Sequence, residues 1–304
     1  MTSAAALLAD RIRNSGARRT AFVGLAKNVG KTTALVAALR ELHSLDVVAG
    51  TTSAGRDGED FDAITGEPKP RFHVWQGQLV ASADTTFASA SFSSALVGEL
   101  PFSTRFGPIV LRRAQSEGDV EVIGPTTTSQ LAEACAALEL AGAQLVLLDG
   151  AFGRRAFASA RIADGIVLSV GMAAGGSLEA VLQNARSAIE LLRLPAPSPG
   201  RSSLSIEGAL TDALVSQNPP KPGQTLVADD FASIFLSAEG RRRLEEHGVT
   251  LAVRHPASLL AVTANPTAPG RPAMSASKFF ETLHNAFPDL PLLDLHANLS
   301  AGLP

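Results

Sequence analysis

The sequence predicts an α/β protein with a mostly parallel, doubly wound sheet, and three features of the chain support this fold class. Short, continuous apolar runs typical of buried parallel strands alternate with stretches of helical periodicity along much of the 304 residues. One of these runs leads directly into a glycine-containing loop that opens a helix. Another ends in an aspartate, at the carboxyl edge where open α/β sheets bind their ligands.

The glycine loop is the most informative stretch of the chain. Residues 24–33 read Gly-Leu-Ala-Lys-Asn-Val-Gly-Lys-Thr-Thr, between an apolar run at 20–23 and a helical stretch at 34–39. Glycines let backbone N–H groups wrap a phosphate chain, and the helix N-terminus adds the positive end of its dipole. This is the phosphate-loop (P-loop) pattern, which predicts nucleotide binding by Gly24, Lys27, Asn28, Val29, Gly30, Lys31, Thr32 and Thr33.

Two loop residues have specific chemical roles in this pattern. Lys31 is expected to reach the β- and γ-phosphates and is therefore a catalytic candidate. The Thr32 hydroxyl is expected to bind Mg²⁺. The cofactors predicted on this basis are ATP and Mg²⁺.

Carboxylates after two other strands could complete the metal site. Asp149 closes the apolar run 145–148, which is the Walker-B pattern of a carboxylate opposite the P-loop. Asp57 lies in the polar loop 52–60 after the second strand, where it could bind Mg²⁺ or orient the attacking group. We therefore predict Asp57 as both a metal ligand and a catalytic residue, with a solvated acidic loop as the alternative.

Further residues near these carboxylates are weaker candidates. Glu59 and Asp60 are alternatives to Asp57 in the same loop. Arg154 and Arg155, shortly after the Walker-B aspartate, could stabilise charge on phosphate oxygens, although arginines in loops are often only solvated.

Recognition of the nucleotide base requires residues outside the P-loop. The guanine-reading sequence Asn-Lys-x-Asp does not occur in the chain, which favours ATP over GTP. After a late apolar strand, Asn265 and Pro266 follow Val-Thr-Ala, a position from which the Asn265 amide could lie beside a base. A turn formed by the Asn-Pro pair is the alternative.

Composition excludes several other classes of function. A net charge of −3 gives no electrostatic basis for nucleic-acid binding. Cys135 is the only cysteine and lies in a helical stretch, so we interpret it as a buried packing residue. No apolar run is long enough to span a membrane, and the N-terminus lacks the basic region of a signal peptide. We expect a soluble, cytoplasmic protein.

The other predicted elements follow the chain in order, beginning around the P-loop. A capped amphipathic helix through about residue 15 leads to a strand over 19–24, and a second buried strand covers 46–51. Residues 61–124 are less regular, and we predict that they form an insertion over the nucleotide edge of the sheet.

Inside this insertion the pattern favours two hairpins. The first would pair 72–75 with 78–81 around a glycine, and the second would pair 108–113 with 120–124. The Ser/Ala/Phe-rich segment 84–97 is expected to form a short helix with loops.

Regular alternation returns after the insertion. A helix near 128–141, strands over 144–149 and 166–171, and a helix near 177–194 are predicted before the Pro/Gly-rich boundary at 195–200. Beyond it lie apolar pieces at 225–228, 249–253, 259–263 and 292–295, with helical stretches at 238–247 and 275–287. These pieces could extend the first sheet or form a small companion domain.

The predicted organisation is thus an NTPase core followed by an extension. Residues 1–194 form the core with its insertion, and residues 201–304 form a C-terminal α/β extension or small subdomain. The complete fold prediction is a mostly parallel, doubly wound P-loop NTPase sheet with a β-hairpin-containing insertion and this C-terminal extension.

Taken together, the motifs resemble those of the P-loop subunit of the lysine 5,6-aminomutase reactivase. More broadly, the chain is similar to the SIMIBI class of P-loop NTPases, which includes dethiobiotin synthetase. The most specific features are the Lys-Asn inside the P-loop and the Gly-Arg-Asp-Gly-Glu loop. The segments that carry the resemblance, in order, are 26–33, 52–59, Val-Ile-Gly-Pro at 122–125, Leu-Leu-Asp-Gly-Ala at 147–151 and Val-Thr-Ala-Asn-Pro at 262–266.

The resemblance implies an ATPase that reactivates an adenosylcobalamin-dependent aminomutase together with a second subunit. ATP-driven conformational change would release damaged cobalamin, with loop 52–60 as a switch that the γ-phosphate orders. Some SIMIBI members carry an extra lysine that acts across a dimer, at the position where this chain has Ala26. Lys27 lies one place later, so we do not assign that role to it. A homodimer is left open.

Two other classes of function remain as alternatives. One is an ATP-dependent small-molecule ligase or kinase of the dethiobiotin synthetase type, in which the insertion 61–124 would shape a substrate pocket. The other is a nucleotide-sensing regulator with negligible turnover.

Overall fold

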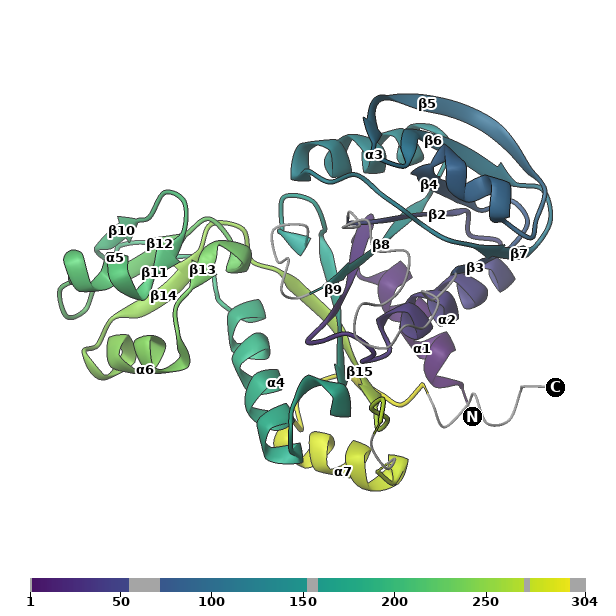
Figure 1. Cartoon of the computed structure of the whole chain (residues 1–304). Helices are drawn as coiled ribbons and strands as arrows, with labels where there is room; N and C mark the ends of the chain where they lie inside the picture. The colour runs from purple at the N-terminus through teal and green to yellow at the C-terminus, as the bar shows by residue number, and fades with distance from the viewer. Residues whose placement is uncertain (1, 55–71, 152–157, 271–273, 296–304) are drawn as a thin grey trace.

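A computed structural model describes residues 2–54, 72–151, 158–270 and 274–295, and the statements below refer to these residues. Within them, a nine-stranded sheet with the order β16-β15-β9-β1-β8-β2-β4-β6-β5 forms the centre of the molecule (Figure 1). All neighbours from β16 to β4 are parallel, and only the last two pairings, β4 with β6 and β6 with β5, are antiparallel. The predicted α/β class with a mostly parallel sheet is confirmed.

The strands of this sheet come from both ends of the chain. In chain order they are β1 (Arg19–Gly24), β2 (Ala49–Ser53), β4 (Leu79–Ala83), β5 (Ser94–Thr104), β6 (Gly107–Ala114), β8 (Leu145–Ala151), β9 (Gly165–Gly171), β15 (Ser258–Asn265) and β16 (Leu292–Leu293). The helices that cover it are α1 (Ala4–Asn14), α2 (Lys31–Ser44), α3 (Thr128–Leu140), α4 (Leu178–Leu192) and α7 (Ala276–Ala286), and a single 3₁₀ turn, η3 (Met172–Ala174), follows β9.

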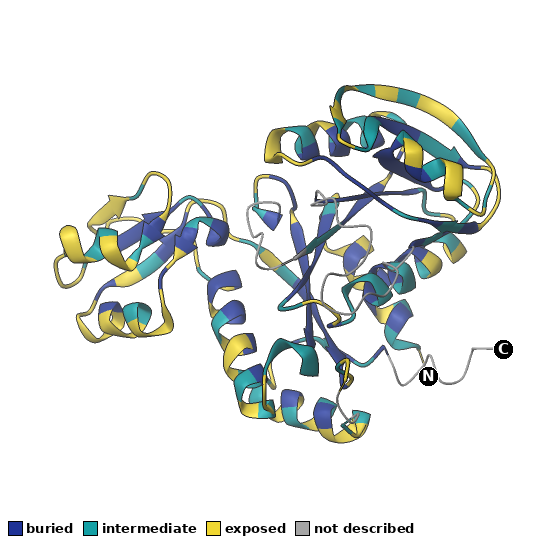
Figure 2. Ribbon diagram, in the orientation of Figure 1, coloured by how far each residue is buried: buried dark blue, intermediate teal, exposed yellow. Residues whose placement is uncertain are grey.

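Helices cover both faces of the large sheet, which gives two hydrophobic layers. On one face, Phe22 of β1 packs in a cluster with Leu35 and other buried side chains of α1 and α2. On the other face, Val23 belongs to a cluster that includes Leu131 of α3 and Phe279 of α7. Burial on both faces explains why these strands read as continuous apolar runs. Figure 2 shows the central strands buried and the outer surfaces of the helices exposed.

The predicted hairpins of the insertion are wrong in their pairing. β3 (Phe72–Val74) pairs antiparallel with β7 (Gly118–Val120), not with the neighbouring β4. The hairpin that does form joins β5 to β6, after the 3₁₀ helix η1 (Asp84–Ser89). The turn before β4 explains this outcome: Gln78, which is 2% exposed, accepts from the Trp75 N–H and donates to the Leu39 carbonyl of α2.

The insertion also lies elsewhere than predicted. All five residues of β4 are buried, which suits an interior strand, and β4 joins the large sheet beside β2. β6 and β5 continue the sheet outward, so the described part of the insertion widens its lateral edge (Figure 1). It therefore does not cover the carboxyl edge where we expected it.

The C-terminal part of the chain divides between a small subdomain and the large sheet, so both arrangements left open by the sequence occur. A small α/β subdomain projects from the large sheet (Figure 1). β15 and β16 then return to the large sheet, so the described residues after 200 contribute both to the subdomain and to the large sheet. The subdomain contains the parallel strands β10 (Ser203–Ser205), β12 (Thr225–Ala228) and β14 (Thr250–Val253), the pair β11 (Leu210–Thr211) and β13 (Ile234–Phe235), the 3₁₀ helix η4 (Phe231–Ser233), and helices α5 (Asp212–Gln217) and α6 (Ala238–Glu246).

Helix α3 is fixed to the large sheet by packing and by one ion pair. Cys135 is fully buried on its inner face, and burial raises the pKa of the thiol to about 12, as expected for a packing residue. At the end of the helix, Glu139 accepts from Arg19 Nε at 2.7 Å and from Arg19 Nη2 at 2.9 Å. Among the described residues, no helix is both long and apolar enough to cross a membrane.

Candidate phosphate-binding site

The predicted P-loop joins the end of β1 to the start of α2, at the carboxyl edge of the large sheet. β1 lies between β8 and β9 in the sheet order, so the loop has a strand end on each side. Asn28 (φ 59°) and Gly30 (φ 91°) both have left-handed backbone conformations, which asparagine and glycine tolerate best. These two residues turn the chain tightly into the helix.

The first turn of α2 has no side-chain cap. Its N-cap is Gly30, which offers no oxygen to the first N–H groups, whereas a Ser or Thr side chain caps α1, α3, α4, α5 and α6. An α-helix leaves its first N–H groups without intrahelical partners, and these groups together with the helix dipole attract anions. The start of α2 is thus suited to a phosphate group.

Lys31 lies across the loop against the end of β1. A Cβ on residue 24 would stand 2.5 Å from Lys31 Cγ, 2.6 Å from Lys31 Cδ and 2.6 Å from Val29 Cγ2. Real Cβ atoms essentially never come this close to a neighbour. Gly24 therefore leaves room for the Lys31 side chain, and a larger residue at this position would force Lys31 or Val29 to shift. Thr32 and Thr33 follow on the partly buried first turn of α2.

Asp149 lies on the strand next to the P-loop strand. In the sheet register it stands between Phe22 of β1 and Ser53 of β2. Leu147, two residues earlier, packs in the cluster with α2, so strand alternation puts the partly buried Asp149 on the same face as α2. The fold thus brings Asp149 to the sheet edge and face at which Thr32 begins α2.

The remaining charged candidates cannot be placed in this way. Asp57, Glu59, Asp60, Arg154 and Arg155 lie outside the described residues. Their predicted roles therefore stay predictions, and Thr32 and Asp149 are the described members of the expected Mg²⁺ site.

The loop also packs on two strands that sequence reasoning did not connect with it. The Leu25 N–H donates to the Ser169 carbonyl of β9 at 3.3 Å. The Ser169 hydroxyl bonds to the Thr263 hydroxyl of β15 at 2.9 Å, and both side chains are buried. At the end of β9, a Cβ on Gly171 would stand 3.0 Å from Val29 Cα. In the sequence, the small residues near the ends of the apolar runs that form β9 and β15 could have indicated this packing.

The Asn265 side chain contacts the loop directly. Its side-chain Nδ2 donates to the Asn28 carbonyl at 3.1 Å, and its Oδ1 accepts from the Thr267 N–H and hydroxyl. The amide that we expected beside a base is therefore engaged with the P-loop backbone and with its own turn. Pro266, which follows it, is also buried.

The end of β2 is held by another close contact. The Ser53 hydroxyl donates to the Val122 carbonyl at 3.0 Å and accepts from the Gly124 N–H at 3.0 Å. A Cβ on Gly124 would overlap the Ser53 carbonyl oxygen and lie 2.7 Å from its carbon. This explains the glycine of the Val-Ile-Gly-Pro segment, and it fixes the chain just before loop 55–60 begins.

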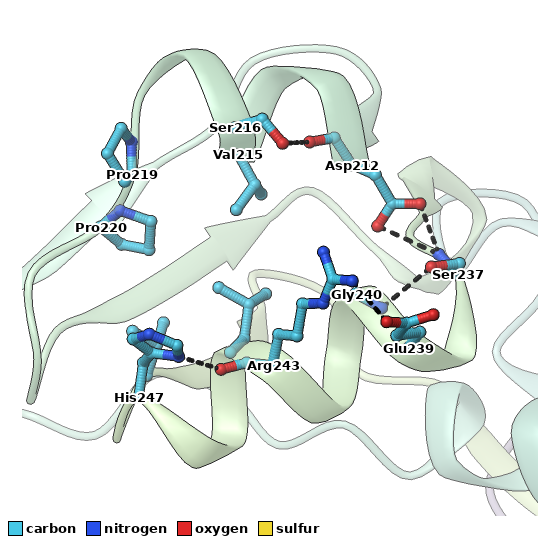
Figure 3. A pocket seen from close by; sticks show the side chains of 12 residues that line it. Asp212, Val215, Ser216, Pro219, Pro220, Ser237, Glu239, Gly240, Arg243 and His247 are labelled. Atoms are coloured by element: carbon cyan, nitrogen blue, oxygen red, sulfur yellow. Dashed lines mark hydrogen bonds and ion pairs between the residues drawn. The ribbon is translucent and has the colours of Figure 1, made fainter.

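Cavities also occur elsewhere among the described residues. One, of about 380 Å³, opens between α5 and α6 of the small subdomain (Figure 3). Its polar side chains bond within the cavity wall: Asp212 accepts from the Ser237 N–H, Glu239 pairs with Arg243, and His247 Nδ1 bonds to the Arg243 carbonyl. These internal bonds leave the cavity without a distinct charged group to select a ligand.

The second cavity, of about 530 Å³, lies between the large sheet and the subdomain. Its wall includes Thr128 and Ser129 of the first turn of α3. Arg161 pairs with Asp229 across this boundary at 2.7 Å, and Ser159 bonds to the buried Asp230. Residues of α3, of the segment before β9 and of the subdomain thus line this cleft.

Comparison with protein-family models, curated proteins and solved structures finds no match to this chain. The described residues nevertheless provide a coherent set of groups at one edge of the sheet. These groups are an uncapped helix start, a lysine across a glycine loop, a hydroxyl, and a carboxylate on the adjoining strand. Groups of these kinds can bind a phosphate chain and its Mg²⁺.

Proposed function

We propose that this protein is a Mg²⁺-dependent ATPase whose phosphate loop is residues 24–33. The observation that carries the proposal is the path of Lys31 across Gly24, beside the uncapped start of α2. In a phosphate loop, this arrangement would place the lysine where it can reach the bound phosphates. The residues on this edge fit both a phosphate chain and Mg²⁺.

Each residue then has a defined task. The N–H groups of the loop and the first turn of α2 bind phosphate oxygens, and Lys31 reaches the β- and γ-phosphates. Thr32 and Asp149 would hold Mg²⁺ directly or through water, and the bound ion would supply positive charge next to the phosphate oxygens. Asp57 orients the attacking water, a role that remains a prediction from the sequence.

Calorimetric titration with ATP and Mg²⁺ tests the proposal. Lys31→Ala removes the ammonium group and should abolish measurable ATP binding while circular dichroism shows an intact fold. Lys278→Ala is the matched control, because Lys278 is an exposed lysine on α7. An unchanged ATP affinity in Lys31→Ala, or equal losses in both variants, would contradict the assignment of this site.

The motif resemblance supports a more specific form of this function. In that form, the ATPase acts with a second subunit as a reactivating factor for an adenosylcobalamin-dependent aminomutase, and ATP drives release of damaged cobalamin. A pull-down from the native cell, with and without a non-hydrolysable ATP analogue, tests this form. Recovery of a cobalamin enzyme in only one nucleotide state would support this form. Equal recovery with and without the analogue would contradict it.

A small-molecule ligase or kinase is the second candidate, because the 530 Å³ cleft beside α3 is large enough for a metabolite. Stimulation of ATP hydrolysis by a metabolite would favour this candidate, and stimulation by a protein would favour the reactivating factor. A nucleotide-sensing regulator would instead bind ATP tightly without releasing phosphate.

A further inference from the structure

Asn265 at the end of β15 is positioned by three hydrogen bonds. Its side chain is nearly inaccessible, because the residue is 6% exposed. Oδ1 accepts from the Thr267 N–H at 3.0 Å and from the Thr267 hydroxyl at 2.8 Å. Both of these partners are donors, so the amide is oriented with Nδ2 toward the P-loop, where it donates to the Asn28 carbonyl at 3.1 Å.

This last bond determines the direction of a neighbouring N–H group. In a trans peptide the carbonyl and the following N–H point to opposite sides. The chain contains no cis peptide among the described residues, so the Val29 N–H points away from Asn265. Asn28 itself has a left-handed conformation (φ 59°), and a fixed carbonyl helps to hold it there.

Close packing reinforces the same arrangement. A Cβ on Gly30 would stand 3.4 Å from Asn265 Cβ, and a Cβ on Gly171 would stand 3.1 Å from the Asn265 carbonyl oxygen. Val29 is 1% exposed. The loop therefore packs tightly against the ends of β9 and β15 and has little room to shift.

We propose that Asn265 is a positioning residue of the P-loop, which holds the Asn28–Val29 peptide so that the Val29 N–H faces a bound phosphate. This inference rests on the proposed function, but it assigns Asn265 to the phosphate chain and not to the base. Because β15 follows the small subdomain in the chain, the inference also includes a strand from the C-terminal part of the chain in the phosphate site.

Binding of ATP and of base-free tripolyphosphate, each with Mg²⁺, tests the proposal by calorimetry. Asn265→Asp keeps the acceptor for Thr267 but places an oxygen against the Asn28 carbonyl. Loss of a hydrogen bond and its orientation should weaken both ligands by a similar factor of about ten or more. If ATP weakens while tripolyphosphate does not, Asn265 reads the base and the proposal is overturned. Unchanged binding of both ligands also overturns it.

Two further variants separate positioning from charge and from local packing. Asn265→Ser removes the Nδ2 donor without adding charge and should reproduce the loss; if only Asn265→Asp shows it, repulsion is the cause and the proposal fails. Asn265→Ser also replaces Asn265→Asp if thermal melting shows that the latter does not fold.

Thr267→Val is the matched control. It removes one of two donors to Oδ1 and keeps the bond to Asn28, so affinity should change by less than about threefold. A loss as large as that of Asn265→Asp would assign the effect to the turn and overturn the proposal. Wild-type protein that binds neither ligand would contradict the ATPase function itself, which is a distinct outcome.

Discussion

Lys31 packs against Gly24, because the lysine side chain occupies the space where residue 24 would carry a Cβ. The two residues belong to different elements, the end of β1 and the start of α2. Their contact therefore couples the strand to the helix across the loop. A change at either residue should affect the loop without reaching the rest of the core.

Gly24→Ala should disrupt this contact. The added methyl would stand 2.5 Å from Lys31 Cγ, so Lys31 or Val29 has to move. We expect ATP affinity to fall by at least about tenfold, with a loss of folding stability of about 1–3 kcal/mol from overpacking. Calorimetry and urea denaturation measure the two effects.

Gly176→Ala is the control for this substitution. Residue 176 has no atom within 4 Å of the added methyl and no strained φ angle. Its binding and stability should stay close to wild type, within about 0.5 kcal/mol. If Gly24→Ala binds ATP as well as Gly176→Ala does, the path of Lys31 has no role in phosphate binding.

Asp149→Asn should weaken binding only in the presence of the metal. The amide keeps the size of the carboxylate but loses its charge, and Mg²⁺ prefers carboxylate oxygens. We expect ATP titrations with Mg²⁺ to show a lower affinity than wild type, and titrations in a chelator to show no difference. A deficit of equal size in both conditions would remove Asp149 from the metal site.

The strand predictions succeeded where local sequence and tertiary burial agree. β1, β8 and β9 are largely apolar because helices cover both faces of the sheet, so their pattern alone located them. The strand and helix on either side of residues 24–33 were located for a similar reason, since they are contiguous in the chain. The position of Asp149 near the end of β8 could be predicted because it follows the apolar run of that strand.

The failed predictions concern partners that lie far apart in sequence. Gly77 has a left-handed conformation (φ 88°) typical of a hairpin turn, but the buried Gln78 ties this turn to α2 and separates β3 from β4. Asn265 and Asn28 are 237 positions apart, and no local pattern shows that their backbone and side chain meet. Pairing and positioning contacts of this kind depend on tertiary structure, which sequence periodicity does not encode.

Gly124→Ala should destabilise the end of β2. The methyl would overlap the Ser53 carbonyl, which is backbone and cannot rotate away. We expect a loss of about 3 kcal/mol in urea denaturation, at the upper end of overpacking effects. Ser53→Ala, which only removes the two hydroxyl bonds, should lose about 1–2 kcal/mol. A smaller loss in Gly124→Ala than in Ser53→Ala would contradict this contact.

The Arg19–Glu139 ion pair should make stability depend on pH. The hydrogen bonds from Arg19 lower the pKa of the Glu139 carboxyl, against the opposing effect of burial. An unfolded glutamate has a pKa of about 4.3. Because the folded-state pKa is lower, the pair contributes fully above that pH and loses its contribution as pH falls through the folded-state value.

Glu139→Gln should therefore lower the free energy of unfolding by about 1.5–3 kcal/mol at pH 7, since hydrogen bonds to charged groups are stronger than neutral ones. The difference from wild type should shrink as pH falls below about 4. Asp10→Asn is the control, because Asp10 and its partner Arg13 have side chains that are 45% and 44% exposed. Exposed pairs contribute little, so this variant should stay within about 0.5 kcal/mol at pH 7. A Glu139→Gln deficit that is equally large at pH 3 and pH 7 would show that lost packing, and not the ionised pair, is responsible.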